Sequence, residues 1–438
     1  MAFPYEKVGE STLLGTKPES IPKFFGWYGK ELEVPAKEYE SRLQRTMQSM
    51  AEAPEPIDFL VVKSPEDIRW LTGFHTIGDS PPQTMVIPKV GEPFMVARLI
   101  EADLVHKYTW IGKVWTCPDV CDVTAVLFQA LQSIFPSGDS NFVVGIQPDV
   151  ISGTAYLRFV DFAKQWSGAK IVDASKAAES PRLLKSAFEV DCIKKAANMT
   201  AGAMTAGLNS IKVGVPLCDL QVVILQSMFS AGSEDPSYSP IVRTTDPSGH
   251  GGWEVNEKAG AGEMVFLEFA ATVMGHHAPA MRTAYIMGPG ESSPPVWLLE
   301  AEKLIQKVFD EVLPMMVPRA RACDIDTAAH KILMSNSHGL VQSSRTGYTV
   351  GGTAVNPVGN AGWGDADFSL VGHNVAPLKE GMVFHFIPWF QKYKGPCTGP
   401  IGLSDTVMVT ASGGQRMSSL PLQVTFLNED GSKWESSQ

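Results

Sequence analysis

Apolar residues in the first part of the chain recur with two spacings, one typical of helices and one typical of strands. Residues 38–52 place apolar side chains three and four positions apart, which predicts an amphipathic helix. Short apolar runs typical of buried strands follow, at 57–62, 84–88, 93–97 and 142–146. Val90-Gly91-Glu92 separates the middle two runs and predicts a hairpin. We therefore expect an α/β domain, a mixed sheet with covering helices, over residues 37–178.

The second part of the chain carries longer helical patterns. One begins near Lys185 and ends before Gly214, and others recur at 218–231, 296–313 and 322–337. Strand-like apolar runs lie at 264–273, 382–390 and 405–410. This order predicts an α+β domain in which helices pack on a strongly curved antiparallel sheet. The expected divisions are an N-terminal extension, a mixed-sheet domain, a helix-on-sheet domain and a C-terminal tail, at 1–36, 37–178, 179–425 and 426–438.

Composition limits the classes of function. The 438 residues are 44% hydrophobic and carry a formal net charge of −11, whereas a nucleic-acid partner favours a basic face. No uninterrupted apolar stretch approaches the roughly 18 residues of a membrane span. The N-terminal sequence MAFPYEKVGEST lacks the basic-then-apolar order of a secretory signal. We therefore expect a cytoplasmic enzyme with reduced cysteines and without nucleic-acid or membrane partners.

Glu268 is an acidic residue in the middle of an apolar strand pattern, MVFLEFAATV. Its own face of the strand also carries Phe266 and Ala270. A carboxyl group buried in such surroundings has a raised pKa unless it is paired. The alternative is a glutamate on a water-exposed face. The apolar neighbours favour the buried and functional interpretation.

Histidines gather around this strand. His276 and His277 follow it directly, His250 lies in the glycine-flanked segment SGHGGW, and His385 lies in the later strand pattern VFHFIP. A single histidine is usually structural or exposed, but several around a buried carboxyl group suit acid–base catalysis.

Two further residues are candidates for the same site. Arg282 could pair with a substrate carboxylate or with a structural acid. Tyr348 lies among glycines in the segment RTGYTVGG, either presenting its phenol to a cavity or packing within a turn. This segment has no G-K-[ST] and no G-x-G-x-x-G after a strand, so it is not a phosphate-binding loop.

Taken in order, these segments resemble a known superfamily. The chain contains WLTGF, KSAFEVDCIKKA, GEMVFLE, MRT, GYTVG, EGMVF and DTVMVT. From about residue 37 to 425 this succession is similar to the creatinase/prolidase/aminopeptidase P superfamily. The resemblance implies a creatinase-like N-terminal domain followed by a pita-bread catalytic domain.

The metallopeptidases of that superfamily bind two metal ions through two Asp, one His and two Glu. The matching positions in this chain are Glu268, Pro279, Tyr348, Ile387 and Ser404. Proline and isoleucine cannot ligate a metal through their side chains. The resemblance therefore implies neither a metal centre nor another cofactor.

Within the superfamily, the chain is most similar to ectoine hydrolase and related creatinase-like proteins. It differs from creatinase itself at Met281, where creatinase carries a glutamate before R-T. The resemblance implies hydrolysis of a C–N bond in a small amidine or amide, with Glu268 as nucleophile or base. A longer loop at 250–262 and an insertion at 352–380 leave open a substrate other than ectoine.

The resemblance also suggests the remaining roles. His250 or His277 would protonate the leaving nitrogen, while Tyr348 and His385 would donate hydrogen bonds to the developing charge. The expected substrate contacts are Arg98, Arg282, Trp363 and Asp405. The protein is expected to be a homodimer in which the N-terminal domain of one chain, through Arg98, reaches the site of the other.

Two other functions stay open. One is a metal-free lyase, isomerase or other non-hydrolytic enzyme on the same scaffold, because one fold supports several chemistries. The other is a catalytically inactive pita-bread protein that only binds a ligand.

Overall fold

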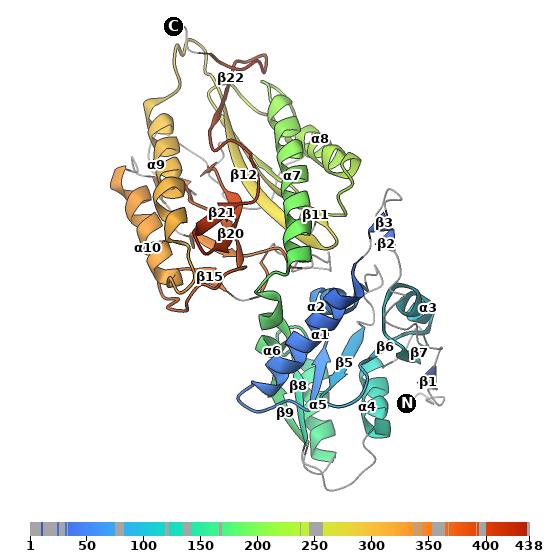
Figure 1. The fold of residues 1–438 in the computed structure, drawn as a ribbon. Coiled ribbons are helices and arrows are strands. Elements are labelled where there is room, and N and C mark those ends of the chain that lie inside the picture. The colour runs from blue at the N-terminus through green and yellow to red at the C-terminus, as the bar shows by residue number, and fades with distance from the viewer. Residues whose placement is uncertain are drawn as a thin grey trace. The chain divides into compact units, whose positions relative to one another are not determined.

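The computed structural model describes most of the chain (Figure 1). The described residues are 34–74, 83–118, 122–134, 142–165, 169–236, 238–244, 257–336, 344–352, 364–366, 368–390 and 400–435. The backbone of short strands at 10–11, 24–25, 31–32, 340–341 and 392–393 is described as well. The chain forms two compact units that meet between Arg182 and Leu183.

The first unit is built on a mixed sheet with the strand order β1-β7-β6-β5-β4-β8-β9. These strands are β1 Glu10–Ser11, β4 Phe59–Val62, β5 Thr84–Pro88, β6 Phe94–Arg98, β7 Lys113–Cys117, β8 Phe142–Ile146 and β9 Ala169–Asp173. β5 and β6 are antiparallel, and Gly91 between them has φ +112°, which confirms the predicted hairpin. β1 belongs to the segment expected to be an irregular extension, but it pairs with β7 and adds an edge strand to the sheet.

Helices cover both faces of this sheet because its strands are apolar on both sides. On β4, Leu60 and Val62 belong to the cluster under α1 Ala36–Ala51 and α2 Pro65–Thr72, whereas Phe59 and Val61 belong to the cluster under α4 Val123–Ile134 and α5 Gly153–Gln165. The period of two along the strand thus sends alternate residues to opposite layers. The remaining helices of this unit are α3 Leu99–Tyr108 and α6 Ser175–Glu179.

The second unit contains two main sheets. One has the order β10-β11-β12-β22 and comprises β10 Ile241–Arg243, β11 Met264–Val273, β12 His276–Ile286 and β22 Thr425–Leu427. The other has the order β15-β14-β16-β20-β21 and comprises β15 Ser369–Leu370, β14 Gly347–Thr349, β16 Val383–Phe386, β20 Asp405–Thr410 and β21 Gly413–Arg416. The pairing is antiparallel, as predicted, except between β12 and β22, which are parallel.

The prediction of one strand over 382–390 is wrong in one respect, because the strand is broken after Phe386. Pro388 has no N–H to donate to the ladder, so β16 ends and a separate strand, β17 Trp389–Phe390, pairs with β19 Ile401–Gly402.

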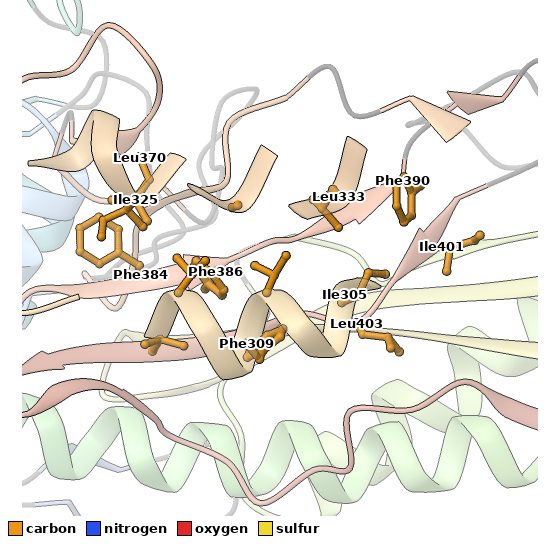
Figure 2. Close-up of a cluster of buried hydrophobic side chains, with 14 of the residues drawn as sticks. Ile305, Phe309, Ile325, Leu333, Leu370, Phe384, Phe386, Phe390, Ile401 and Leu403 are labelled. Atoms are coloured by element: carbon orange, nitrogen blue, oxygen red, sulfur yellow. The ribbon is translucent and has the colours of Figure 1, made fainter. Parts of the chain in front are cut away.

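Each main sheet of the second unit has its own helices. α7 Ala187–Asn209 and α8 Leu217–Ser230 pack on β11 through Leu267 and Phe269, and a capping box of Ser186 and Glu189 starts α7. α9 Val296–Val312 and α10 Ala322–Leu333 pack on β16, as Figure 2 shows for Phe309 and Phe386. A further buried cluster draws on β11, β12, β14 and β16, and therefore on both sheets.

Two expectations from composition can be compared with the structure. Among the described helices, none is long and apolar enough to cross a membrane. Cys192, Cys218 and Cys323 are free thiols, but Cys117 at the end of β7 forms a disulfide, so the expectation of reduced cysteines is wrong there. The partner of Cys117 lies outside the described residues.

Candidate active site

Glu268 lies in the middle of β11, directly opposite Ile241 of β10 and Met281 of β12. Its neighbours on the same face, Phe266 and Ala270, belong to the cluster shared by the two sheets, and Glu268 itself is 1% exposed. Burial raises the pKa of Glu268 from 4.5 to about 8. A carboxyl group with this pKa can both take and give a proton near neutral pH, as general acid–base catalysis requires.

Tyr348 of β14 and His385 of β16 form a hydrogen-bonded pair. They are opposite each other in the strand register, and 3.0 Å separates the Tyr348 Oη from the His385 Nδ1. Burial raises the pKa of Tyr348 well above 10, and the charge of Glu268 raises it further. Burial lowers the pKa of His385 well below its ordinary value, and the charges of His277 and Arg345 add to this. The phenol is therefore protonated and the imidazole neutral at physiological pH.

Ser404 connects this pair to the strand beside Glu268. Its Oγ lies 2.7 Å from the His385 Nε2 and accepts a 2.7 Å hydrogen bond from the Met281 N–H. Its own N–H donates to the Met281 carbonyl oxygen at 3.2 Å. Ser404 thus joins the two sheets at the level of Glu268. From the sequence, Ser404 was identified only as the position of a metal ligand in the metallopeptidases. No local pattern indicates its contact with His385.

The two adjacent histidines of β12 are both buried. The His276 Nδ1 lies 2.7 Å from the Gly351 carbonyl oxygen, which anchors β12 to the end of the glycine-rich segment. His277 is opposite Thr272 in β11, and its charge would lower the pKa of His385. His277 is therefore the predicted acid–base histidine that the structure associates with the Tyr348–His385 pair.

Arg345 is a site residue that the sequence interpretation did not single out. Its guanidinium lies 4.2 Å from the centroid of the Tyr348 ring, and its Nη1 donates to the Ser369 Oγ at 3.0 Å. The side chain is exposed, unlike the other groups of the site. The signal was its place in RTGYTVGG, three residues before Tyr348.

Arg282 and Asp405, predicted as substrate contacts, are engaged inside the fold. Arg282 is 1% exposed and donates to four backbone carbonyl oxygens, those of Met281, Ser404, Leu420 and Pro421. Asp405 accepts hydrogen bonds from the Arg416 Nε at 2.8 Å and from the Ser418 Oγ at 2.9 Å. Burial lowers the pKa of Arg282 to about 10 and raises that of Asp405, where Arg416 and Arg282 oppose the rise. These contacts fix the segments around Ser404.

Both units match families of known proteins. The description of metallopeptidase family M24 matches residues 191–411, just over half of the chain, and that of the creatinase/prolidase N-terminal domain matches residues 42–184. The chain belongs to metallopeptidase family M24. The predicted superfamily and fold class are thereby confirmed, and the protein is a member of a hydrolase family.

Individual M24 proteins give the degree of similarity. Ectoine hydrolase of Halomonas elongata is 25% identical over 410 residues, which cover 88% of this chain and 96% of that protein. Creatinase of a Bacillus species is 21% identical over 260 residues, 58% of this chain and 61% of that protein. The crystal structure of a prolidase from Thermococcus sibiricus matches with a TM-score of 0.76 at 17% identity, covering 89% of this chain and 99% of that one, and shows the common fold.

The metal positions of M24 metallopeptidases can be tested on the residues that stand there. Glu268, Tyr348 and Ser404 supply a carboxyl group, a phenol and a hydroxyl group, and Pro279 and Ile387 supply no ligand. Among the described residues, no group of three or more His, Cys, Asp or Glu side chains could hold a metal ion. These donors do not fit a dinuclear centre.

Three predicted site residues have no described place beside Glu268. His250 and Trp363 lie outside the described residues. Arg98 belongs to the first unit, where its Nη2 is 2.9 Å from the Glu101 carboxylate. The roles suggested for these three residues stay predictions.

Proposed function

We propose that this M24 protein is a metal-independent hydrolase that cleaves a C–N bond in a small polar amidine, cyclic amidine or amide. The observation that carries the proposal is the burial of Glu268 close enough to the Tyr348–His385 pair to raise the pKa of the phenol. The similarity to ectoine hydrolase supports the bond type, and the chemistry of the five metal positions supports the absence of a metal.

Each group has a defined task in this reaction. The ionised Glu268 takes a proton from water while the water oxygen bonds to the substrate carbon, or attacks that carbon itself with water releasing the product later. The C–N bond then breaks and the leaving nitrogen takes a proton, so that one water molecule is consumed. The phenol of Tyr348 donates a hydrogen bond to the charge that develops in the transition state. His277 is the described candidate for the acid.

Arg345 suggests the charge of the substrate. It is the exposed cation of the described site, and its guanidinium can bind a carboxylate with two hydrogen bonds. We therefore expect acidic substrates, such as N-acyl amino acids or carboxylated amidines, to be preferred over neutral ones of the same size.

The proposal is tested with a panel of cyclic amidines, guanidino compounds and N-acyl amino acids. Compounds that raise the melting temperature are incubated with the protein in ¹⁸O-labelled water. We expect a product that carries one ¹⁸O atom. Turnover without labelled oxygen would replace hydrolysis by elimination or rearrangement. If compounds bind but none is turned over, the protein is a catalytically inactive binding protein.

We also propose a homodimer. The resemblance to creatinase supports it, as do the apolar side chains exposed on α3, Leu99, Ile100 and Leu104, of which Ile100 is 72% exposed. Light scattering should give twice the 47.5 kDa mass of the chain. Ile100→Glu should shift the protein towards monomer, whereas the matched exposed change Val90→Glu on the turn between β5 and β6 should not. A fully active monomeric wild type would contradict the proposal.

A further inference from the structure

We infer that Ser404 is a positioning residue that fixes the tautomer of His385 and thereby leaves the Tyr348 hydroxyl group as a donor to the substrate. The inference assigns a direction to the chain of hydrogen bonds from Met281 through Ser404 and His385 to Tyr348. It deepens the proposed function and rests on it only for the effect on turnover.

The backbone N–H of Met281 sets the direction of these hydrogen bonds. An amide N–H can only donate, so the Ser404 Oγ must accept the bond from the Met281 N–H at 2.7 Å. The same Oγ lies 2.7 Å from the His385 Nε2, and Ser404 and His385 are fully buried. A buried hydroxyl group that kept its proton away from an acceptor would lose the free energy of a hydrogen bond. The Ser404 O–H therefore donates to Nε2, which must be unprotonated.

The tautomer of His385 then decides which atom donates in its hydrogen bond with Tyr348. A neutral imidazole carries one proton, and the lowered pKa of His385 keeps the ring neutral. With Nε2 accepting, the proton is on Nδ1, which donates to the Tyr348 Oη at 3.0 Å. The Tyr348 O–H is not used in this bond and can donate to a substrate oxygen or nitrogen, or to the carboxylate of Glu268.

The opposite direction of hydrogen-bond donation is less favourable for the hydroxyl groups of both Ser404 and Tyr348. If Nε2 carried the proton, the Ser404 hydroxyl proton would have no acceptor among its described contacts, and Tyr348 would donate its proton to the ring. The phenol could then stabilise no charge on the substrate. A carboxylate at position 404, as in metal-binding M24 proteins, can only accept and would require this opposite direction. The hydroxyl group at 404 is thus matched to a site in which Tyr348 acts as a donor.

The tautomer can be measured without any substrate. In protein labelled with ¹⁵N-histidine, two-bond ¹H–¹⁵N correlations identify which ring nitrogen carries the proton, and loss of a signal in His385→Gln assigns His385. We expect the Nδ1–H form in the wild type. His276 provides an internal reference, since its Nδ1 must donate to the Gly351 carbonyl oxygen. An Nε2–H signal from His385 in the wild type would overturn the inference, and only the assignment of that signal uses a variant.

Two variants separate the hydroxyl group from the space it occupies. Ser404→Ala should give a mixed or reversed His385 tautomer while the His276 signals stay unchanged, and Ser404→Thr should restore the Nδ1–H form. With a substrate in hand, Ser404→Ala should lower kcat about 10-fold or more with little change in KM, and threonine should rescue it. An unchanged tautomer in Ser404→Ala would contradict the inference. The expected tautomers in a protein that hydrolyses no C–N bond would contradict only the proposed function.

Discussion

The two units of the protein bury acidic residues in opposite ways. In the first unit, Asp67 is 1% exposed, its Oδ1 lies 3.1 Å from the Arg182 Nε, and its Oδ2 accepts a 2.6 Å hydrogen bond from the Gln147 Nε2. In the second unit, Glu268 is equally buried, and burial raises its pKa from 4.5 to about 8. The groups that the structure associates with it, Tyr348 and the neutral His385, are weak acids and bases.

The difference separates a structural acid from a chemical one. A buried carboxylate paired with arginine links the elements that carry the two partners, here α2 and the end of the first unit. A buried carboxyl group whose pKa lies near 8 is costly to ionise but can exchange protons. A change at one of these acids leaves the other in place as its control.

The largest expected effect is on turnover when Glu268 is replaced by Gln. The change keeps the shape and the hydrogen-bonding capacity of the side chain but removes the carboxylate oxygen that takes a proton or attacks. Turnover should fall at least about 10²-fold, the low end of what loss of a general base costs. The melting temperature at neutral pH should not fall, because glutamine removes the free-energy cost of keeping this carboxyl group protonated above pH 4.5.

The outcome against this interpretation is a stable Glu268→Gln protein with near-normal turnover. It would remove Glu268 from the mechanism and shift attention to His250, which sequence analysis also predicted, together with Tyr348. A variant that unfolds but retains turnover per folded molecule would make Glu268 a structural residue like Asp67.

Asp67→Asn should have the reverse effect, on stability rather than on chemistry. It removes the charge that pairs with the buried Arg182, whose side chain is 8% exposed. Breaking a buried pair from one side costs about 3 kcal/mol or more in free energy of unfolding. Chemical denaturation should detect this loss, while turnover per folded molecule should stay within about twofold of the wild type. A large loss of turnover in folded Asp67→Asn would end the distinction between the two acids.

The pH dependence of stability sharpens the comparison further. The folded chain holds the Glu268 proton up to about pH 8, whereas the unfolded chain releases it near the ordinary value of 4.5. The contribution of this group to stability is therefore complete below pH 4.5 and is lost as the pH rises to about 8, by at most about 1.4 kcal/mol per pH unit. Glu268→Gln should lack this component, so the stability of the variant relative to the wild type should increase between pH 5 and pH 8. Parallel stability curves would show that the pKa of Glu268 is not raised.

The sequence predicted those parts of this arrangement that depend on local pattern. The alternation of MVFLEFAATV placed Glu268 on a buried face, and the register of β11 confirms that placement. The turn at Gly91 was predicted because Val90-Gly91-Glu92 separates two apolar runs, and the positive φ of Gly91 agrees with it. The superfamily followed from the order of several short motifs, although each motif alone is common.

Contacts between distant segments could not be predicted in this way. Arg282 could have met a substrate or a structural acid, and its actual partners are carbonyl oxygens up to 139 residues away. The contact of Ser404 with His385 likewise depends on how the two sheets meet, which no periodicity encodes. No role for Arg345 could be predicted, because a cation stacked on a phenol leaves no spacing pattern in the sequence.

The smallest expected effect is that of metal removal, which should be none. In an M24 metallopeptidase the acid of β11 would be a metal ligand, whereas here the matching positions include Pro279 and Ile387. Glu268 should then titrate as a buried carboxyl group with or without chelator, and treatment with a chelator should leave turnover and melting temperature unchanged. Elemental analysis of the purified protein should find no stoichiometric Mn, Zn, Co or Fe. About two tightly held ions per chain, or a loss of activity that added metal restores, would contradict the distinction between the two acids. Glu268 would then be paired with a cation, as Asp67 is paired with Arg182.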